Sequence, residues 1–388
     1  MGNIAPKDYV QTEFEDSKRD LNEGSIPKVA AEYQEHLSKM QNLPLHIAVT
    51  GKAGAGKSSF VNAFRGINDN EEEAAEVGLA EEMTKPTAYP HPSFPNIKIW
   101  DLPGIGTCNS EAAEYLEKVQ FERYDVFIIV TADRFTENDA LLAKEIRRMR
   151  KKFYYVRTKV DVSIEAERRR RNFNMEETLE TMRKYCEDNL KAEGKLSARV
   201  FLISNRQIHM YDFPLLQETM AAELPDHKKH ILTLAVQIFS EENLMVKKAQ
   251  MRSYIRKLAW VSCACGALPV PGLSIACDVA ILLSARKCFR KVFGLDERSL
   301  CFLSLQTGKD FTELRSAIQK TRLADTINAR LVLSLLTKSG LWVMVSSVKI
   351  LGTLFGGASS FATTYYFLNN FLEKSVEDAR NVPAKLLK

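Results

Sequence analysis

A glycine-rich loop at residues 51–58 carries the residue types in this chain that are best suited to chemistry. It reads Gly-Lys-Ala-Gly-Ala-Gly-Lys-Ser, the Gly-x-x-x-x-Gly-Lys-[Ser/Thr] pattern of a phosphate-binding (Walker A) loop. Its glycines let backbone N–H groups turn inward around a phosphate, Lys57 neutralises phosphate charge, and the Ser58 hydroxyl can ligate Mg²⁺. The predicted phosphate-contacting residues are Gly51, Gly54, Ala55, Gly56, Lys57, Ser58 and Ser59. The alternative interpretation of this segment is an ordinary glycine-rich turn.

A second candidate is Asp101-Leu102-Pro103-Gly104, which follows the strand-like run Ile97–Trp100. At the end of a strand, Asp101 can reach Mg²⁺ through a water molecule, and Gly104 can bring a backbone N–H to a γ-phosphate. Asp and Pro-Gly are also common in turns, so the tetrapeptide alone is a weak signal. Its position after the phosphate-binding loop and a second strand makes the signal strong, and it predicts Ser58 and Asp101 as the metal-binding pair.

The segment Thr158-Lys159-Val160-Asp161 ends the strand-like run Phe153–Arg157 and predicts which base is bound. The Asp161 carboxylate can accept the N1–H and N2 amino hydrogens of guanine, whereas adenine offers no such paired donors. The aliphatic stem of Lys159 can lie along the base. Thr158 stands where this motif more often has Asn, and we expect the change to remove one side-chain tie to the phosphate-binding loop.

A last strand-like run, Val200–Ile203, ends at Ser204-Asn205. These two residues can form a rim for the base, and by themselves they also fit a simple turn. Four matches in this order favour a guanine nucleotide, GTP or GDP with Mg²⁺, over an adenine nucleotide.

Particular elements are needed to position these residues. The apolar run Leu45–Val49 predicts the strand that delivers the loop, and residues 59–64 predict the helix that leaves it. Strands and helices alternate over 43–225, which is typical of an α/β fold with a mostly parallel sheet that binds ligands at its carboxyl edge. Residues 1–42 predict a short helical segment, and 226–388 predict a C-terminal helical domain.

The composition is that of an ordinary globular protein. The chain has 388 residues, enough for two domains, and a net charge of only +5, which gives no indication of nucleic-acid binding. Its seven cysteines form no Cys-x-x-Cys pair, and the polar N-terminus has no signal-peptide pattern. We therefore expect reduced thiols and a cytoplasmic protein that is not secreted.

Two apolar stretches lie in the C-terminal part. Leu258–Ala285 is split by Pro269-Val270-Pro271-Gly272, so each half is too short to span a bilayer, and we expect a buried helical hairpin. Ile350–Leu372 carries no charge and is long enough to span, but it contains many polar residues. A transmembrane helix and a packed helix both remain open for this second stretch.

The chain resembles the interferon-inducible, immunity-related GTPases. The residues that carry the resemblance are the loop at 51–58, Arg65-Gly66-Ile67 with Glu71-Glu72-Glu73, Tyr89-Pro90-His91-Pro92, Trp100–Gly106, Phe153–Asp161 and Tyr211-Asp212-Phe213-Pro214. They cover most of 43–225. The helical remainder is similar more loosely, through Pro269–Gly272 and Phe293-Gly294-Leu295-Asp296.

The resemblance implies a Ras-like GTPase domain at 43–225 and an all-helical domain built from 1–42 and 226–388. It implies slow GTP hydrolysis that is stimulated by dimers or oligomers, with itself or with related GTPases, in cell-autonomous innate immunity. It also implies peripheral recruitment to the lipids of intracellular (ER/Golgi or vacuolar) membranes. Lys57 groups the chain with members that keep the Walker lysine, and Glu81 matches a catalytic glutamate near the γ-phosphate.

Several residues depart from the family pattern. The family commonly has Thr at the positions of Val77 and Met83, and these changes bear on switch closure and turnover. Met1-Gly2 is similar to a myristoylated member, but Pro6 stands where the acylation pattern has Ser or Thr. The sequence thus leaves open a slow GTPase that assembles on membranes, a nucleotide-gated scaffold with negligible hydrolysis, and an integral membrane GTPase anchored by Ile350–Leu372.

Overall fold

The computed structural model describes residues 44–78, 85–104, 115, 117–132, 135–192, 199–266, 273–321 and 353–386. Their contacts divide them between two compact units. The first lies within Leu43–Phe239 and Cys301–Lys309, and the second within Ser240–Leu300 and Asp310–Lys388. The predicted N-terminal segment at 1–42 lies outside the described residues.

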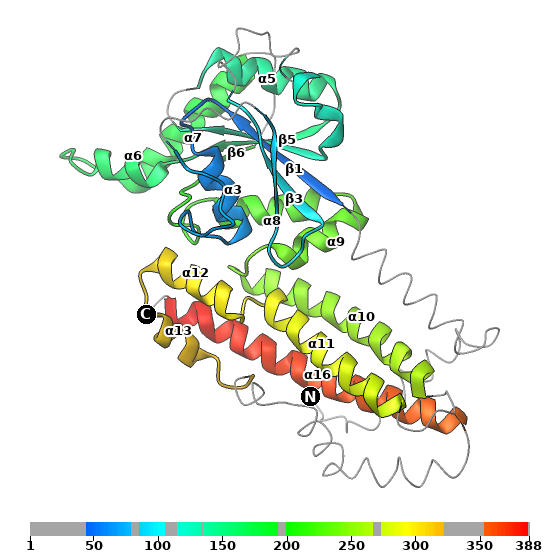
Figure 1. Ribbon diagram of the computed structural model, residues 1–388. Coiled ribbons are helices and arrows are strands. Elements are labelled where there is room, and N and C mark those ends of the chain that lie inside the picture. Colours follow the sequence, from blue (N-terminus) through cyan, green and yellow to red (C-terminus); the bar gives the residue numbers. More distant parts are fainter. Residues whose placement is uncertain are drawn as a thin grey trace. The chain divides into compact units, whose positions relative to one another are not determined.

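The first unit is built on a single sheet (Figure 1). Its strand order is β2-β3-β1-β4-β5-β6. The strands are β1 (Leu45–Gly51), β2 (Thr87–Pro90), β3 (Ile97–Asp101), β4 (Val126–Thr131), β5 (Lys152–Arg157) and β6 (Val200–Leu202). All neighbouring pairs are parallel except β2 and β3, which are antiparallel. Because the other strands run the same way, their carboxyl ends lie along one edge of the sheet.

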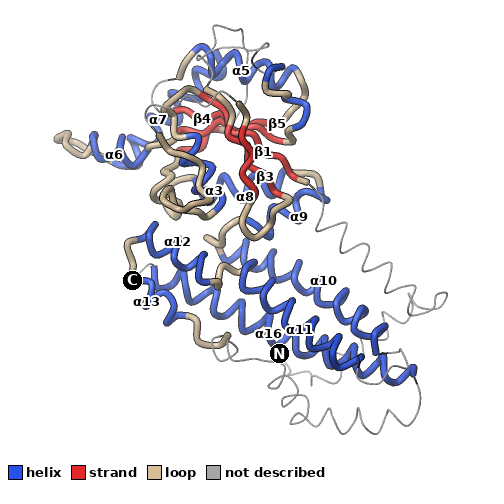
Figure 2. The backbone as a smooth tube through the Cα atoms, in the orientation of Figure 1, coloured by secondary structure: helices blue, strands red, loops and turns tan. Residues whose placement is uncertain are grey.

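Helices cover both faces of this sheet (Figure 2). They are α3 (Lys57–Arg65), α5 (Glu137–Arg148), α6 (Val160–Glu167), α7 (Met175–Ala192), α8 (Phe213–Glu223) and α9 (Asp226–Ala235), with a 3-10 turn η1 (Phe121–Arg123). One core joins Ile47 and Val49 of β1 to residues of α3, α8 and α9. The other core joins Ala48 of the same strand to residues of α5, α6 and α7. This is the period-two alternation of a strand that is buried on both faces.

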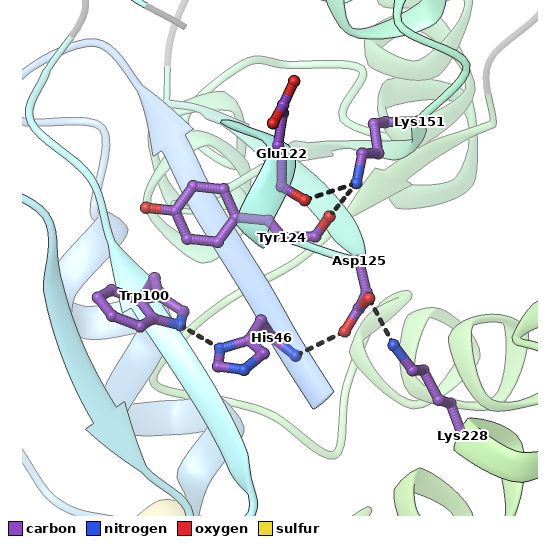
Figure 3. A network of polar contacts seen from close by, with 7 residues as sticks. All are labelled: His46, Trp100, Glu122, Tyr124, Asp125, Lys151 and Lys228. Atoms are coloured by element: carbon purple, nitrogen blue, oxygen red, sulfur yellow. Dashed lines mark hydrogen bonds and ion pairs between the residues drawn. The ribbon is translucent and has the colours of Figure 1, made fainter. Parts of the chain in front are cut away.

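A polar network holds the amino-terminal edge of the sheet (Figure 3). The Asp125 carboxylate accepts from the backbone N–H of His46 on β1 at 2.9 Å and from Lys228 Nζ on α9 at 2.5 Å. Trp100 Nε1 donates to His46 Nδ1 at 3.0 Å, and the Arg123 guanidinium lies 3.8 Å from the centre of the Trp100 ring. The network therefore ties β1, β3, η1 and α9 together at the edge opposite the carboxyl ends of the strands.

The second unit is helical. Its elements are α10 (Glu241–Gly266), α11 (Leu273–Val292), α13 (Phe311–Ala317) and α16 (Thr353–Leu386), while α12 (Glu297–Thr307) is divided between the two units. Asp278 of α11 is buried where α10 and α16 meet it, and it accepts from Ser262 Oγ at 2.5 Å and from Ser360 Oγ at 3.1 Å. Among the helices that the structure describes, none has the length and hydropathy of a bilayer-spanning segment.

The mostly parallel α/β sheet and the helical C-terminal part confirm the predicted fold class. The two halves of Leu258–Ala285 are the end of α10 and the start of α11, and residues 267–272 between them lie outside the described residues. The division at residue 225 stays a prediction. In the structure α9, which follows it, packs Ile231 and Leu232 into a core of the sheet, and the unit continues to Phe239.

Candidate nucleotide-binding site

The loop at 51–58 joins the carboxyl end of β1 directly to α3, as the sequence predicts. Gly51 has a φ of 139°, and a Cβ built there would lie 2.0 Å from the carbonyl oxygen of Val130 on β4. Gly54 and Gly56 have φ values of 76° and 86°, in the left-handed region that favours glycine. The loop therefore needs glycine at Gly51 for lack of space, and at Gly54 and Gly56 for backbone conformation.

Ser58 and Asp101 are brought together from α3 and β3. Ser58 Oγ donates to Asp101 Oδ2 at 2.5 Å, and Asp101 is only 1% exposed. Burial raises the pKa of Asp101, while the Ser58 hydroxyl and the Lys57 cation oppose that rise. Asp101 Oδ1 is buried and has no hydrogen-bond partner among the described residues. An oxygen pair with an unsatisfied carboxylate oxygen fits the hard oxygen ligands that Mg²⁺ requires.

Lys57 begins α3 and points back along the loop. Its Nζ donates to the Lys52 carbonyl oxygen at 3.2 Å. Burial lowers the pKa of Lys57, and the nearby Asp101 carboxylate opposes that change. A partly desolvated ammonium beside a glycine-rich loop is well placed to attract a polyphosphate.

Thr158 corrects one expectation. We predicted that Thr in place of Asn would remove a side-chain tie to the phosphate-binding loop, and this prediction is wrong. Thr158 is fully buried, and its Oγ1 donates to the Ala55 carbonyl oxygen of the loop at 2.6 Å. The same oxygen lies 3.2 Å from the Thr131 carbonyl oxygen at the end of β4. The end of β5 lies close enough to the loop for a short hydroxyl side chain to make the contact.

Two further side chains reach carbonyls of the same loop. Lys159 has a φ of 56°, and its Nζ donates to Gly54 O at 2.9 Å. Asn205 Nδ2 donates to Gly56 O at 3.1 Å, while Asn205 Oδ1 is buried without a partner among the described residues. Ser204 Oγ instead accepts from the backbone N–H groups of Arg206 and Gln207, both at 3.2 Å, so it shapes the turn after β6.

Asp161 lies in the first turn of α6 and is partly exposed. Burial raises the pKa of Tyr211, and the Asp161 charge adds to that rise. Tyr211 has a φ of 54°, and the next residue, Asp212, accepts from Leu202 N and Arg183 Nη1, each at 2.8 Å. These contacts of Asp212 fix the loop after β6, a role that the sequence marked only as part of a family motif.

Comparison with known proteins assigns the family. Residues 10–386 match the family model described as Interferon-inducible GTPase (IIGP). The chain belongs to the interferon-inducible GTPase family. Interferon-inducible GTPase 5 of Rattus norvegicus is 39% identical over 383 residues, covering 97% of this chain and 82% of the relative. Interferon-gamma-inducible GTPase 10 of Mus musculus is 36% identical over 365 residues, covering 93% and 86%.

Among solved structures, Toc33 from Arabidopsis thaliana in complex with Mg²⁺ and GMPPNP is 19% identical. The match covers 46% of this chain and 78% of that chain, with a TM-score of 0.32. At that TM-score the likeness adds nothing to the family assignment. Two findings identify this chain as a GTPase. It belongs to the family, and its phosphate-binding loop is hydrogen-bonded to Asp101 and to Thr158.

The segment from Val77 to Met83, which we call the first switch segment because the family resemblance places Glu81 near the γ-phosphate, is only partly described by the structure. Val77 is described and is 51% exposed, so the side chain that replaces the usual Thr points mainly into solvent. Glu81 and Met83 lie outside the described residues. The loop that precedes Val77 is tied to α3 by Asn62, whose amide accepts from Ala75 N at 2.7 Å and donates to Ala75 O at 2.9 Å. No sequence pattern marked Asn62 for this role.

Proposed function

We propose that this chain is a GTP-binding, slowly GTP-hydrolysing switch that self-assembles on intracellular membranes in cell-autonomous innate immunity. One observation carries the nucleotide part of the proposal. Asp101 and Thr158–Lys159 lie far from the loop at 51–58 in the sequence, and each is linked to that loop by side-chain hydrogen bonds at the carboxyl edge of the sheet. That edge is where open α/β sheets bind their ligands.

The geometry and the sequence motifs together support the following proposed roles. The loop amides and Lys57 hold the β- and γ-phosphates, and the Gly104 N–H faces the γ-phosphate. Asp161 accepts the paired donors of guanine, with the stem of Lys159 along the base. Ser58 and Asp101 hold Mg²⁺, which when bound supplies charge neutralisation at the β- and γ-phosphates. Asn205 and Thr158 hold the carbonyls of the loop and so keep its N–H groups facing the ligand.

Slow turnover is expected from the residues after Gly104. The next two are Ile105 and Gly106, so no Gln is available there to orient an attacking water. Family resemblance places Glu81 near the γ-phosphate, and a partner subunit is the other source of a water-positioning group. Without such help, hydrolysis depends on electrostatic positioning alone. We therefore infer that a homodimer or oligomer, or a hetero-oligomer with related GTPases, is the faster catalyst.

Immunity and membrane recruitment rest on family membership. The relatives are named as interferon-inducible GTPases, and we extend that setting to this chain. We infer a cytoplasmic protein that associates peripherally with ER/Golgi or vacuolar membrane lipids. Membrane recruitment can be checked by flotation with liposomes in the GDP-bound and GMPPNP-bound states.

The test of the proposed activity is GTP turnover as a function of protein concentration, with ATP as the negative control. We expect phosphate release from GTP, negligible release from ATP, and a specific activity that rises with concentration. The Lys57→Ala variant is expected to lose activity at every concentration. Specific activity that stays flat over a wide concentration range contradicts assembly-driven catalysis.

The alternative function is a nucleotide-gated scaffold with negligible hydrolysis. The exposed, apolar Val77 favours it, because a side chain without a hydroxyl cannot ligate Mg²⁺ from the first switch segment. Single-turnover decay of bound GTP separates the two functions. If bound GTP decays appreciably and Lys57→Ala abolishes that decay, the chain is not a pure scaffold. If bound GTP does not decay in either dilute or concentrated protein, the scaffold function is supported.

A further inference from the structure

The hydroxyl of Tyr115 lies between two parts of the candidate site, although none of the sequence motifs includes it. Tyr115 is 4% exposed, and its OH donates to the Pro103 carbonyl oxygen at 2.7 Å. The same OH lies 2.8 Å from Oγ1 of Thr50, which is fully buried. Pro103 precedes Gly104, and Thr50 precedes the first glycine of the phosphate-binding loop.

The direction of these hydrogen bonds can be assigned. A phenol has one proton, and in Tyr115 that proton goes to the Pro103 carbonyl, which can only accept. Thr50 Oγ1 must then donate to the Tyr115 oxygen. A chain of hydrogen bonds therefore runs from the end of β1 through Tyr115 to Pro103, and both hydroxyl protons are used.

The accepting carbonyl belongs to the same peptide group as the Gly104 N–H. The peptide bonds of the described residues are all trans, and in a planar trans peptide the N–H points opposite to the C=O. A hydrogen bond that fixes the Pro103 oxygen therefore also fixes the direction of the Gly104 N–H. The Tyr115 hydroxyl acts on that N–H without touching it.

Gly104 is also close to the phosphate-binding loop. A Cβ built on Gly104 would lie 3.0 Å from the Ala53 nitrogen and 3.3 Å from its Cα. The Pro103–Gly104 peptide therefore lies between the buried Tyr115 hydroxyl and the backbone of the loop at Ala53. Its orientation decides where the Gly104 N–H points relative to a ligand bound by the loop.

We propose that Tyr115 is a positioning residue that aims the Gly104 N–H at the γ-phosphate, so that it favours GTP over GDP. The inference rests on the proposed function, in which Gly104 faces the γ-phosphate. GDP has no γ-phosphate, and its binding is therefore expected to be insensitive to the Tyr115 hydroxyl. Thr50 supports the same contact by orienting the Tyr115 oxygen.

Tyr115→Phe tests this, because it removes one oxygen and keeps the ring. We expect affinity for GMPPNP with Mg²⁺ and single-turnover hydrolysis of GTP to fall about tenfold, the scale of one hydrogen bond. Affinity for GDP is expected to change less than about twofold, because none of its groups meets the Gly104 N–H. Thr50→Val should lower the ratio of GMPPNP affinity to GDP affinity, as Tyr115→Phe does. The effects of the two substitutions on this ratio should not add in the double variant.

Tyr124→Phe is the matched control. Tyr124 is also fully buried, and its OH donates to the Val119 carbonyl oxygen at 3.0 Å, at the amino-terminal edge of the sheet. Both tyrosine variants are expected to lower the melting temperature to a similar extent. Only Tyr115→Phe is expected to change the ratio of GMPPNP to GDP affinity.

The outcomes are distinct. If Tyr115→Phe weakens GDP and GMPPNP equally, or leaves the ratio unchanged, the positioning role is overturned. If Tyr124→Phe shifts the ratio as much as Tyr115→Phe, the effect is a general loss of stability and the inference is also overturned. If the wild-type chain does not bind GMPPNP with Mg²⁺ at all, the proposed function itself fails, before Tyr115 is in question.

Discussion

At the scale of single residues, Thr158 shows how one buried hydroxyl can replace a longer amide. Its Oγ1 donates to the Ala55 carbonyl at 2.6 Å, and Asn205 donates to the next carbonyl, Gly56 O. Lys159 Nζ donates to the carbonyl oxygen of Gly54, the residue before Ala55. The phosphate-binding loop is thus supported on three carbonyls by side chains from the ends of β5 and β6, and each side chain can be removed separately.

The first prediction concerns this support. Thr158→Val keeps the shape of the side chain and leaves the buried Ala55 carbonyl without its donor, which costs about 1–3 kcal/mol. We expect a lower melting temperature and GDP affinity weakened about tenfold, measured by calorimetry. Thr158→Ser keeps the hydroxyl and is expected to stay within about threefold of the wild type. If Thr158→Val and Thr158→Ser weaken GDP affinity equally, the hydrogen bond from Thr158 Oγ1 to the Ala55 carbonyl is not the support that we assign to it.

The sequence predicted those site residues whose spacing is set by the local chain. Gly51, Lys57 and Ser58 follow one strand directly, and Asp101 meets Ser58 because β1 and β3 are parallel neighbours. The tie from Thr158 was mispredicted, since its partner is a carbonyl on another loop and the distance depends on how β1, β4 and β5 lie together. Tyr115 could not be found at all, because a tyrosine at that position carries no pattern and its role depends on two contacts in space.

At the scale of elements, the two edges of the sheet have different roles, one in ligand binding and one in stability. The carboxyl edge holds the candidate site. At the opposite edge Asp125 joins β1 to α9 (Figure 3). The antiparallel β2 and the packing of α9 onto the sheet were not predicted, because β2 is short and ends in Pro90, and α9 has no strand after it to mark it as part of the α/β pattern.

The second prediction separates the two edges. Asp125→Ala removes the acceptor of His46 N and of Lys228 Nζ. The Asp125 and Lys228 side chains are only 24% and 21% exposed. We expect the free energy of unfolding to fall by about 2 kcal/mol, with GDP affinity unchanged. Glu165→Ala, which breaks the exposed pair with Arg168, should cost less than about 1 kcal/mol. A large loss of GDP affinity in Asp125→Ala would contradict this separation of tasks.

The third prediction concerns the helical unit. Burial raises the pKa of Asp278 from 3.8 to about 6, although Ser262 and Ser360 oppose the rise. Between these two values the folded chain holds a proton that the unfolded chain has lost. Stability from this group is therefore fully present below about pH 4 and is lost as the pH rises through about 6.

Asp278→Asn removes this pH dependence. The wild type should lose a few kcal/mol of unfolding free energy relative to Asp278→Asn as the pH rises from 4 to 6.5. Denaturant unfolding at several pH values, followed by circular dichroism, measures the difference between the two proteins. A difference that is constant over this range would show that Asp278 is not protonated in the folded state.

At the scale of the whole molecule, the proposed switch requires that nucleotide state change assembly. The fourth prediction is that light scattering detects larger particles with GMPPNP and Mg²⁺ than with GDP at the same protein concentration. Lys57→Ala, which weakens the hold on the phosphates, is expected to stay small with either nucleotide. Particle sizes that do not depend on nucleotide would contradict a nucleotide-gated assembly, for the enzyme and for the scaffold alike.

The most direct measurement compares GDP, xanthosine diphosphate and ADP binding by calorimetry in the wild type and in Asp161→Asn. Xanthine has a carbonyl where guanine has its N2 amino group, and an Asn amide can donate to that carbonyl whereas a carboxylate cannot. We expect the wild type to prefer GDP over both others by about 100-fold, and Asp161→Asn to prefer xanthosine diphosphate. A wild type that binds ADP as well as GDP, or an Asp161→Asn variant that keeps its preference for GDP, would contradict the claim that Asp161 chooses the base.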